Sequence, residues 1–142
     1  MNSESKHRTA DFADSALASF VLLAQFLGTP ADGQQIHHDR GKGDEPYGFD
    51  DLIRIAKRLG LTARRKRAEI DALAKLPLPA LISLADGGTA ILLKTDDSGE
   101  TGTKYMVLKP SSERPEIWSD EQLAGALNLQ GGIADVLLMT SR

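Results

Sequence analysis

The side chains that could perform chemistry are few in this sequence. It contains no cysteine and three histidines, His7, His37 and His38. Without cysteine there can be no thiolate nucleophile, disulfide bond or thiolate metal site. His37, His38 and Asp39 form the densest group of potential metal ligands, but adjacent side chains point in different directions and no further histidine or cysteine lies near them in the sequence. The sequence therefore predicts no metal site.

A second acidic group combines Asp96, Asp97 and Glu100 with intervening glycine. Such a composition could hold calcium, but the spacing does not match the alternating oxygen ligands of an EF-hand loop. We interpret this segment as the turn of a β-hairpin.

Seven basic residues lie between Leu52 and Ala68, and no acidic residue lies among them. The simplest interpretation is a solvated surface that includes a charged strand edge protected against pairing. The functional alternative is an electrostatic surface for an acidic polypeptide or for anionic lipid. Nucleic acid is a further alternative, although the net charge of −3 argues against a dedicated nucleic-acid-binding domain. The basic residues are Arg54, Lys57, Arg58, Arg64, Arg65, Lys66 and Arg67.

The first element that could position these groups is a helix from Ser15 to Leu27. Its apolar residues recur at helical spacing, Asp14 can cap its start, and Gly28 can stop it. Its apolar stretch is far shorter than the roughly 18–20 residues that span a bilayer. We expect a largely buried helix, preceded by a flexible tail over residues 1–13.

The segment Pro30–Tyr47 shows no periodicity and is interpreted as a loop. Apolar residues from Phe49 to Leu59 then lie on one face of a second helix, which ends at Gly60. The length of 142 residues and a hydrophobic fraction of 41% suit one globular domain.

Beyond the second helix the pattern predicts short strands with one further helix among them. Ser119, followed by Glu121 and Gln122, opens a helix that ends near Leu127. Trp118 is either a hydrophobic staple or an exposed anchor. This order of elements predicts an α+β domain with antiparallel hairpins. The predicted strands are Leu61–Arg67, the runs around Leu81 and Ile91–Leu93, Tyr105–Leu108 and Val136–Met139.

Three local motifs add to this order. The segment 14–20 stands where active bacteriocin-processing peptidases carry an Asp-Cys-Gly-Ala-Ala-Cys-Leu type signature. Residues 48–61 match a Gly…Leu…Ala-x-x-Leu-Gly-Leu helix, and residues 78–82 match a Leu-Pro-Ala-Leu-Ile strand before a Gly turn. The chain thus resembles, over nearly its whole length, the bacteriocin-processing peptidase domain of exporter ABC transporters. The resemblance implies a papain-like α+β fold over residues 14–142, with a central antiparallel sheet packed on an N-terminal helix.

Active members of that family use a cysteine nucleophile, a histidine base and an aspartate that orients the base. The resemblance places Ser15, Thr89 and Lys109 at these three positions. A serine hydroxyl is a weak nucleophile without a base, and threonine cannot accept its proton near neutral pH. We therefore expect no proteolysis, and a leader-peptide peptidase with a relocated site is the enzymatic alternative.

Degenerate domains of this kind occur in exporters of RTX toxins related to the hemolysin exporter, where they bind the unfolded substrate. The resemblance implies this role here, at the cytoplasmic face of the bacterial inner membrane, with transmembrane and nucleotide-binding domains following. ATP and magnesium are expected only in the full-length transporter, no cofactor is expected in this domain, and the isolated domain is expected to be a monomer. The alternative is a structural adaptor that does not contact the substrate.

The predicted substrate-binding residues are Phe26, Arg64, Arg65 and Ser83. Exporter relatives place an aromatic residue of the substrate surface near the end of the first helix, where Phe26 lies, although a lone aromatic at helical spacing also suits the core. That subgroup often keeps the histidine beside an aromatic residue, and the corresponding positions here hold Thr89 and Ser83. The sequence predicts a single surface that carries Phe26, Arg64 and Arg65.

Overall fold

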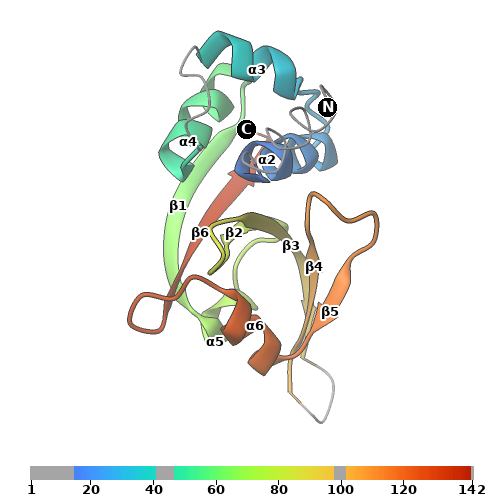
Figure 1. The fold of residues 1–142 in the computed structure, drawn as a ribbon, viewed down its shortest axis with the longest axis vertical. Coiled ribbons are helices and arrows are strands. Elements are labelled where there is room, and N and C mark those ends of the chain that lie inside the picture. Colours follow the sequence, from blue (N-terminus) through green and yellow to red (C-terminus); the bar gives the residue numbers. More distant parts are fainter. Residues whose placement is uncertain (1–14, 41–46, 98–101, 142) are drawn as a thin grey trace, which may run out of the picture.

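A six-stranded antiparallel sheet with the order β1-β6-β2-β3-β4-β5 runs through the molecule (Figure 1). β2 to β5 form a meander, and β6 returns to lie between β1 and β2. The strands are β1 (Thr62–Glu69), β2 (Ala80–Ser83), β3 (Thr89–Asp96), β4 (Lys104–Leu108), β5 (Glu116–Trp118) and β6 (Ile133–Thr140).

The structure, a computed structural model, describes residues 15–40, 47–97 and 102–141. The predicted tail over residues 1–13, the predicted cap Asp14, His7 and Glu100 lie outside these ranges. β3 and β4 pair in antiparallel register on either side of the predicted hairpin turn.

The helices gather at two ends of the sheet (Figure 1). Because side chains alternate between the faces of a strand, the sheet has two hydrophobic cores. One face packs against α2 and α4, and the other packs against α5 and α6. The helices are α2 (Ser15–Phe26), α3 (Gly33–Arg40), α4 (Phe49–Arg58), α5 (Ile70–Leu73) and α6 (Asp120–Ala126).

α2 confirms the predicted first helix. Leu17, Phe20 and Leu23 lie on its buried face against the sheet. Gly28 adopts a φ of 84°, a left-handed conformation that glycine reaches without strain and that ends the helix. The central antiparallel sheet packed on an N-terminal helix is therefore confirmed.

α4 confirms the predicted second helix to within one residue. Its start is capped because the backbone N–H of Gly48 donates to Asp51 Oδ2 at 3.0 Å. Leu52 and Ala56 are fully buried on its inner face. This helix covers β1 and brings its acidic first turn close to that strand.

The interpretation of Pro30–Tyr47 as a loop is wrong, because α3 lies within it. The helix has little apolar periodicity, and Ile36 packs against the core. Its start is stabilised by Asp32, whose Oδ1 accepts the N–H groups of Gln34 and Gln35 at 3.0 and 3.3 Å. Asp32, a favoured capping residue, was the sequence signal that could have predicted the start of this helix.

Two short elements were not predicted, namely α5 and β5. β5 has three residues and α5 has four, which is too few to show a period. Trp118 in β5 is 8% exposed, and its Nε1 donates to Glu116 Oε1 at 2.9 Å. The alternative of Trp118 as an exposed anchor is therefore wrong.

Within the described ranges, no helix combines the length and the hydrophobicity needed to cross a membrane.

Candidate functional site

Ser15, Thr89 and Lys109 line one cleft, although they come from three distant parts of the sequence. Ser15 is the first residue of α2, Thr89 is the first residue of β3, and Lys109 directly follows β4. The cleft has a volume of about 160 Å³. Asp86 and Ser111 also line it, and none of the described residues that line it is a cysteine or a histidine.

The hydroxyl of Ser15 accepts a hydrogen bond from the backbone N–H of Thr89 at 3.1 Å. One helical turn later, the buried Ser19 Oγ donates to the backbone carbonyl of Thr89 at 3.2 Å. Two serines of α2 thus bind both backbone groups of the first residue of β3. Ser19 was not predicted as a site residue, and its only signal was a polar residue on the buried face of the helix.

The turn between β2 and β3 packs closely against Ser15. A Cβ atom at Gly88 would lie 3.3 Å from Ser15 Oγ and 3.0 Å from Asp86 Oδ1, so a side chain there would force these groups to move. The N–H of Gly88 donates to Asp86 Oδ1 at 2.8 Å. No hydrogen bond among the described residues joins Asp86 to Ser15. Asp86 therefore contributes to the shape of the turn, and it is the one carboxylate among the described residues lining the cleft.

Lys109 brings a positive charge into the cleft. Its Nζ lies 5.7 Å from the centroid of the Trp118 ring, within the range of a cation–π contact. An ammonium group has three donors and no acceptor, so it cannot orient an imidazole by accepting its N–H.

Phe26 lies at the far end of α2 from the cleft. It lies eleven positions after Ser15, which corresponds to roughly 16 Å along a helix. Its side chain is 52% exposed, so it is a surface residue and not part of the core. Ser83 ends β2 opposite Thr89, and its backbone carbonyl accepts the N–H of Asn128 at 3.0 Å.

The predicted single surface carrying Arg64 and Arg65 is wrong. Adjacent residues of a strand point to opposite faces, and these arginines pair in register with Leu138 and Leu137, which belong to different cores. Phe26 is on a separate element, at the end of α2.

Arg65 is engaged within the domain. Its Nε and Nη2 donate to Asp135 at 3.1 and 2.7 Å, and its Nη1 lies 3.4 Å from Asp50 Oδ1. The guanidinium also lies 5.7 Å from the centroid of the Phe49 ring. These bonds, with Asp135 the main cause, raise the pKa of Arg65. Arg64 makes no ion pair among the described residues.

The basic residues between Leu52 and Ala68 are thus partly neutralised by acids from outside that stretch. Arg54 pairs with Asp51 at 2.6 Å, as Arg65 pairs with Asp50 and Asp135. Sequence reasoning missed these acids because two precede the stretch and the third lies on β6.

One further titratable group is perturbed, away from the cleft. Tyr105 on β4 is 2% exposed, and its hydroxyl donates to Asp120 Oδ1 at 2.7 Å. Burial, followed by this hydrogen bond, raises the pKa of Tyr105 to about 12. The bond joins β4 to the first residue of α6.

His37 and His38 lie on α3, and His37 Nδ1 is 3.0 Å from the hydroxyl of Tyr47. In the part of the chain that the structure describes, no group of three or more histidine, cysteine or acidic side chains could hold an ion.

Residues 5–124 match the model of a family described as the peptidase C39 family. The cyclolysin secretion/processing ATP-binding protein CyaB of Bordetella pertussis is 30% identical over 122 residues, which is 80% of this chain and 17% of that protein. The alpha-hemolysin translocation ATP-binding protein HlyB of Escherichia coli O157:H7 is 29% identical over 129 residues, or 90% of this chain and 17% of that protein. The chain therefore spans about a sixth of the length of these relatives.

Two solved structures share the fold. The N-terminal peptidase C39 like domain of the toxin secretion ATP-binding protein from Vibrio parahaemolyticus has a TM-score of 0.73 at 22% identity, covering 91% of this chain and 98% of that one. The peptidase domain of Streptococcus ComA has a TM-score of 0.71 at 14% identity, covering 92% of this chain and 93% of that one.

Proposed function

Because the chain belongs to the peptidase C39 family, we propose that it is the N-terminal peptidase-like domain of an ABC exporter that binds an unfolded RTX-type protein without cleaving it. Relatives that translocate toxins, named above, support this assignment. In this proposal the domain lies at the cytoplasmic face of the inner membrane of a bacterium. Transmembrane and nucleotide-binding domains follow it, and the latter bind ATP and magnesium.

The proposal that the domain does not cleave its substrate rests on the hydrogen bond that Ser15 Oγ accepts from the N–H of Thr89. A nucleophilic hydroxyl needs a base that accepts its proton, and the described lining of the cleft offers no imidazole. Lys109 supplies a donor where an orienting acceptor is required. The cleft residues thus favour a structural role, in which they hold α2 on β3.

Binding of an unfolded, acidic chain is supported by two exposed regions away from the cleft, one on β1 and one at the end of α2. Arg64, Lys66 and Arg67 are exposed and form no ion pair among the described residues. Phe26 adds an exposed aromatic side chain. Charges of this kind increase the rate of encounter and add modest affinity each, which suits a substrate that must be released into a channel.

A titration with a fluorescently labelled, unfolded RTX-type chain tests the proposal. We expect saturable binding, and Phe26→Ala is expected to weaken it about fivefold, because roughly 1 kcal/mol is lost when half of a phenylalanine can no longer be buried. Ile117→Ala is the matched control, since Ile117 is the other large exposed hydrophobic side chain among the described residues, at 55%. We expect it to change the affinity less than twofold.

The competing functions give different results in the same titration. A structural adaptor would show no binding of the unfolded chain by the wild-type domain. A peptidase with a relocated site would shorten the labelled chain. If Phe26→Ala and Ile117→Ala weaken binding equally, Phe26 is not part of the binding surface.

A further inference from the structure

β1 is a long edge strand. It has eight residues, which corresponds to roughly 26 Å, and it pairs with β6 on one side. Figure 1 shows it along the left rim of the sheet, with α4 beside its upper end and the connection between α6 and β6 beside its lower end. Among the described strands, β6 alone is paired with it. Edge strands of this length are usually protected against pairing with other chains.

The outer edge of β1 has backbone groups available for pairing. In an antiparallel pair, every second residue directs its N–H and C=O away from the partner strand. Among the described residues, no hydrogen bond outside the β1–β6 ladder reaches the backbone of residues 63–68. These groups are open to a further strand.

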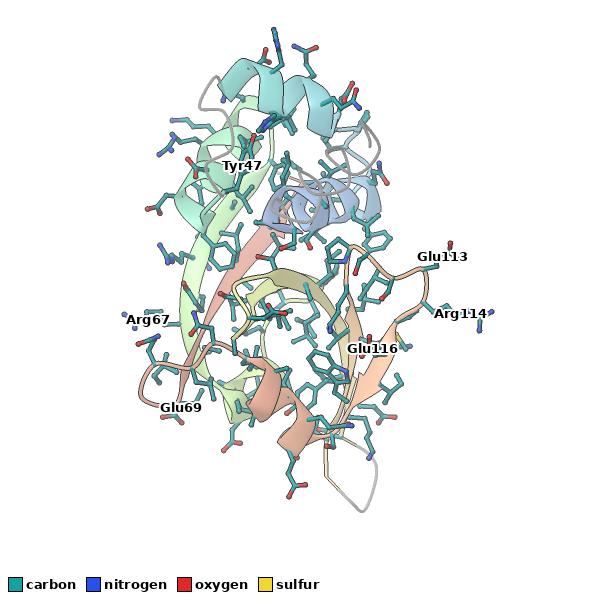
Figure 2. All side chains as sticks on the ribbon, in the orientation of Figure 1. Tyr47, Arg67, Glu69, Glu113, Arg114 and Glu116 are labelled. Atoms are coloured by element: carbon teal, nitrogen blue, oxygen red, sulfur yellow. The ribbon has the colours of Figure 1, made fainter. Side chains whose placement is uncertain are left out.

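Four consecutive side chains of this edge, those of residues 64–67, are basic and exposed, whereas its last residue, Glu69, is acidic and exposed. Arg64 and Lys66 extend from one face of β1, and Arg67 extends from the other. Figure 2 shows Arg67 directed away from the ribbon at the rim. None of the three forms an ion pair among the described residues. A second copy of β1 would bring like charges opposite one another, so this edge disfavours self-association.

The opposite edge of the sheet differs in length and in charge. β5 has three residues. Glu116 is the first residue of β5, and Glu113 lies just before the strand. Figure 2 shows both on the side of the molecule away from β1. The exposed Arg114 lies between them, so the short edge has mixed charge, whereas β1 has four consecutive basic residues, 64–67. An extended acidic strand is therefore complementary mainly to β1.

We propose that an extended acidic segment of the unfolded substrate pairs with the outer edge of β1 as a seventh strand. This inference rests on the proposed function and states how the substrate is held. Backbone hydrogen bonds supply affinity that does not depend on sequence, and Arg64, Lys66 and Arg67 select acidic segments. The mode suits a substrate that threads past the domain, because a strand can shift along the edge.

A polar hollow beside β1 suits the same partner. It has a volume of about 530 Å³ and is lined by Arg67, Asn128, Gln130 and Ile133, together with the ion pair of Arg65 and Asp135. The side chains of Arg67, Asn128 and Gln130 offer N–H donors to a carboxylate. Acidic side chains on the Arg67 face of an added strand would extend towards this hollow.

The test uses a fluorescein-labelled ten-residue peptide that alternates glutamate with threonine, and the purified chain. We expect saturable binding in fluorescence anisotropy and no binding of the peptide in which lysine replaces glutamate. A peptide with the same side chains but with every backbone nitrogen methylated should bind at least tenfold more weakly. Amide hydrogen exchange should slow at alternate residues of β1 when the unmodified peptide is bound.

Charge reversal locates the site. Arg64→Glu with Lys66→Glu should weaken peptide binding roughly tenfold, as expected for the loss of two exposed charge pairs and their replacement by repulsion. Lys57→Glu with Arg58→Glu is the matched control, because both residues are exposed and basic but lie on α4. The control pair should change the affinity less than twofold.

Three results would overturn strand addition. The first is equal binding of the methylated peptide, and the second is equal weakening by the two charge-reversed pairs. The third is binding to anionic phosphatidylserine vesicles with no binding of the peptide. If the unfolded full-length substrate still binds in any of these cases, the proposed function stands and only the mode of binding is wrong. Failure of the unfolded substrate to bind at all would contradict both.

Discussion

The residues of the cleft act as connections between α2 and β3. Ser15 and Ser19 bind the two backbone groups of Thr89, so the start of β3 is held by side chains one helical turn apart. A catalytic serine would instead need its hydroxyl aligned with a base.

Substitution of Ser15 should therefore affect stability. Ser15→Ala removes the acceptor of the Thr89 N–H, and we expect the free energy of unfolding to fall by about 0.5–1.5 kcal/mol. Ser111→Ala is the control, because Ser111 lines the same cleft but is exposed. It should change stability by less than about 0.5 kcal/mol. Urea denaturation measures both, and equal effects would contradict the structural role of Ser15.

Tyr105 makes the stability of the fold depend on pH in the alkaline range. Its pKa is raised from 10 to about 12 in the folded state, so protonated Tyr105 stabilises the fold fully below pH 10. This contribution is lost as the pH rises from 10 to 12, at about 1.4 kcal/mol for each pH unit.

Tyr105→Phe provides the comparison. The difference in unfolding free energy between wild type and Tyr105→Phe should shrink between pH 10 and pH 12, because phenylalanine does not titrate. Chemical denaturation across this range measures the difference. A difference that stays constant with pH would show that Tyr105 titrates equally in the folded and unfolded states.

Among the elements, α6 depends on its cap. Ser119 Oγ accepts the N–H of Gln122 at 3.1 Å, and Gln122 Oε1 accepts the N–H of Ser119 at 2.8 Å. This reciprocal pair starts the helix that buries Leu123 and presents Asp120 to Tyr105. The helix has seven residues, so its stability depends on capping and packing more than on its length.

We expect Ser119→Ala to lower the free energy of unfolding by about 1 kcal/mol. Ser119→Asp should retain most of the wild-type stability, because aspartate also accepts the N–H of the third helical residue. Thermal unfolding of the two variants measures the difference. Equal loss in both would contradict the explanation that the side chain stabilises the helix by accepting this N–H.

The elements with periodic or capped sequences could be predicted. α2, α4 and α6 have buried faces or capping residues that the sequence displays directly. α3 could not be found by periodicity, because it has little apolar face and depends on the Asp32 cap. β5 is too short for any period and is recognised only through its pairing with β4.

The site could be predicted in part. The alignment of local motifs with the peptidase family placed Ser15, Thr89 and Lys109, and the structure brings them together. The sequence could not show that Arg65 forms ion pairs within the domain and Arg64 does not, because the acids that bind Arg65 come from α4 and β6. Strand geometry implies that adjacent residues point to opposite faces, and the prediction of one surface did not take this into account.

For the whole molecule, charge is the property that should govern partner binding. Its distribution is uneven, since the exposed basic side chains of β1 lie on a chain of net charge −3. The Debye length contracts from about 10 Å at 0.1 M salt to about 3 Å at 1 M. Exposed charge pairs contribute about 0.2–1 kcal/mol each, and salt screens them.

Affinity for an unfolded acidic chain should therefore fall roughly tenfold between 0.1 M and 1 M sodium chloride, which corresponds to about 1.4 kcal/mol. The effect of Phe26→Ala should persist at both salt concentrations, because its contact is apolar. Anisotropy titrations at the two concentrations measure this. Binding that does not change with salt would contradict a role for the basic edge.

The central claim is that the domain binds an unfolded substrate and leaves it intact. The most direct measurement is intact-mass spectrometry of the complex after prolonged incubation with an unfolded, acidic RTX-type chain that also carries a double-glycine leader. We predict a co-eluting complex in which the substrate keeps its full mass. A substrate that is cut after the double glycine by the wild-type domain and not by Ser15→Ala, or that does not bind at all, would contradict the account.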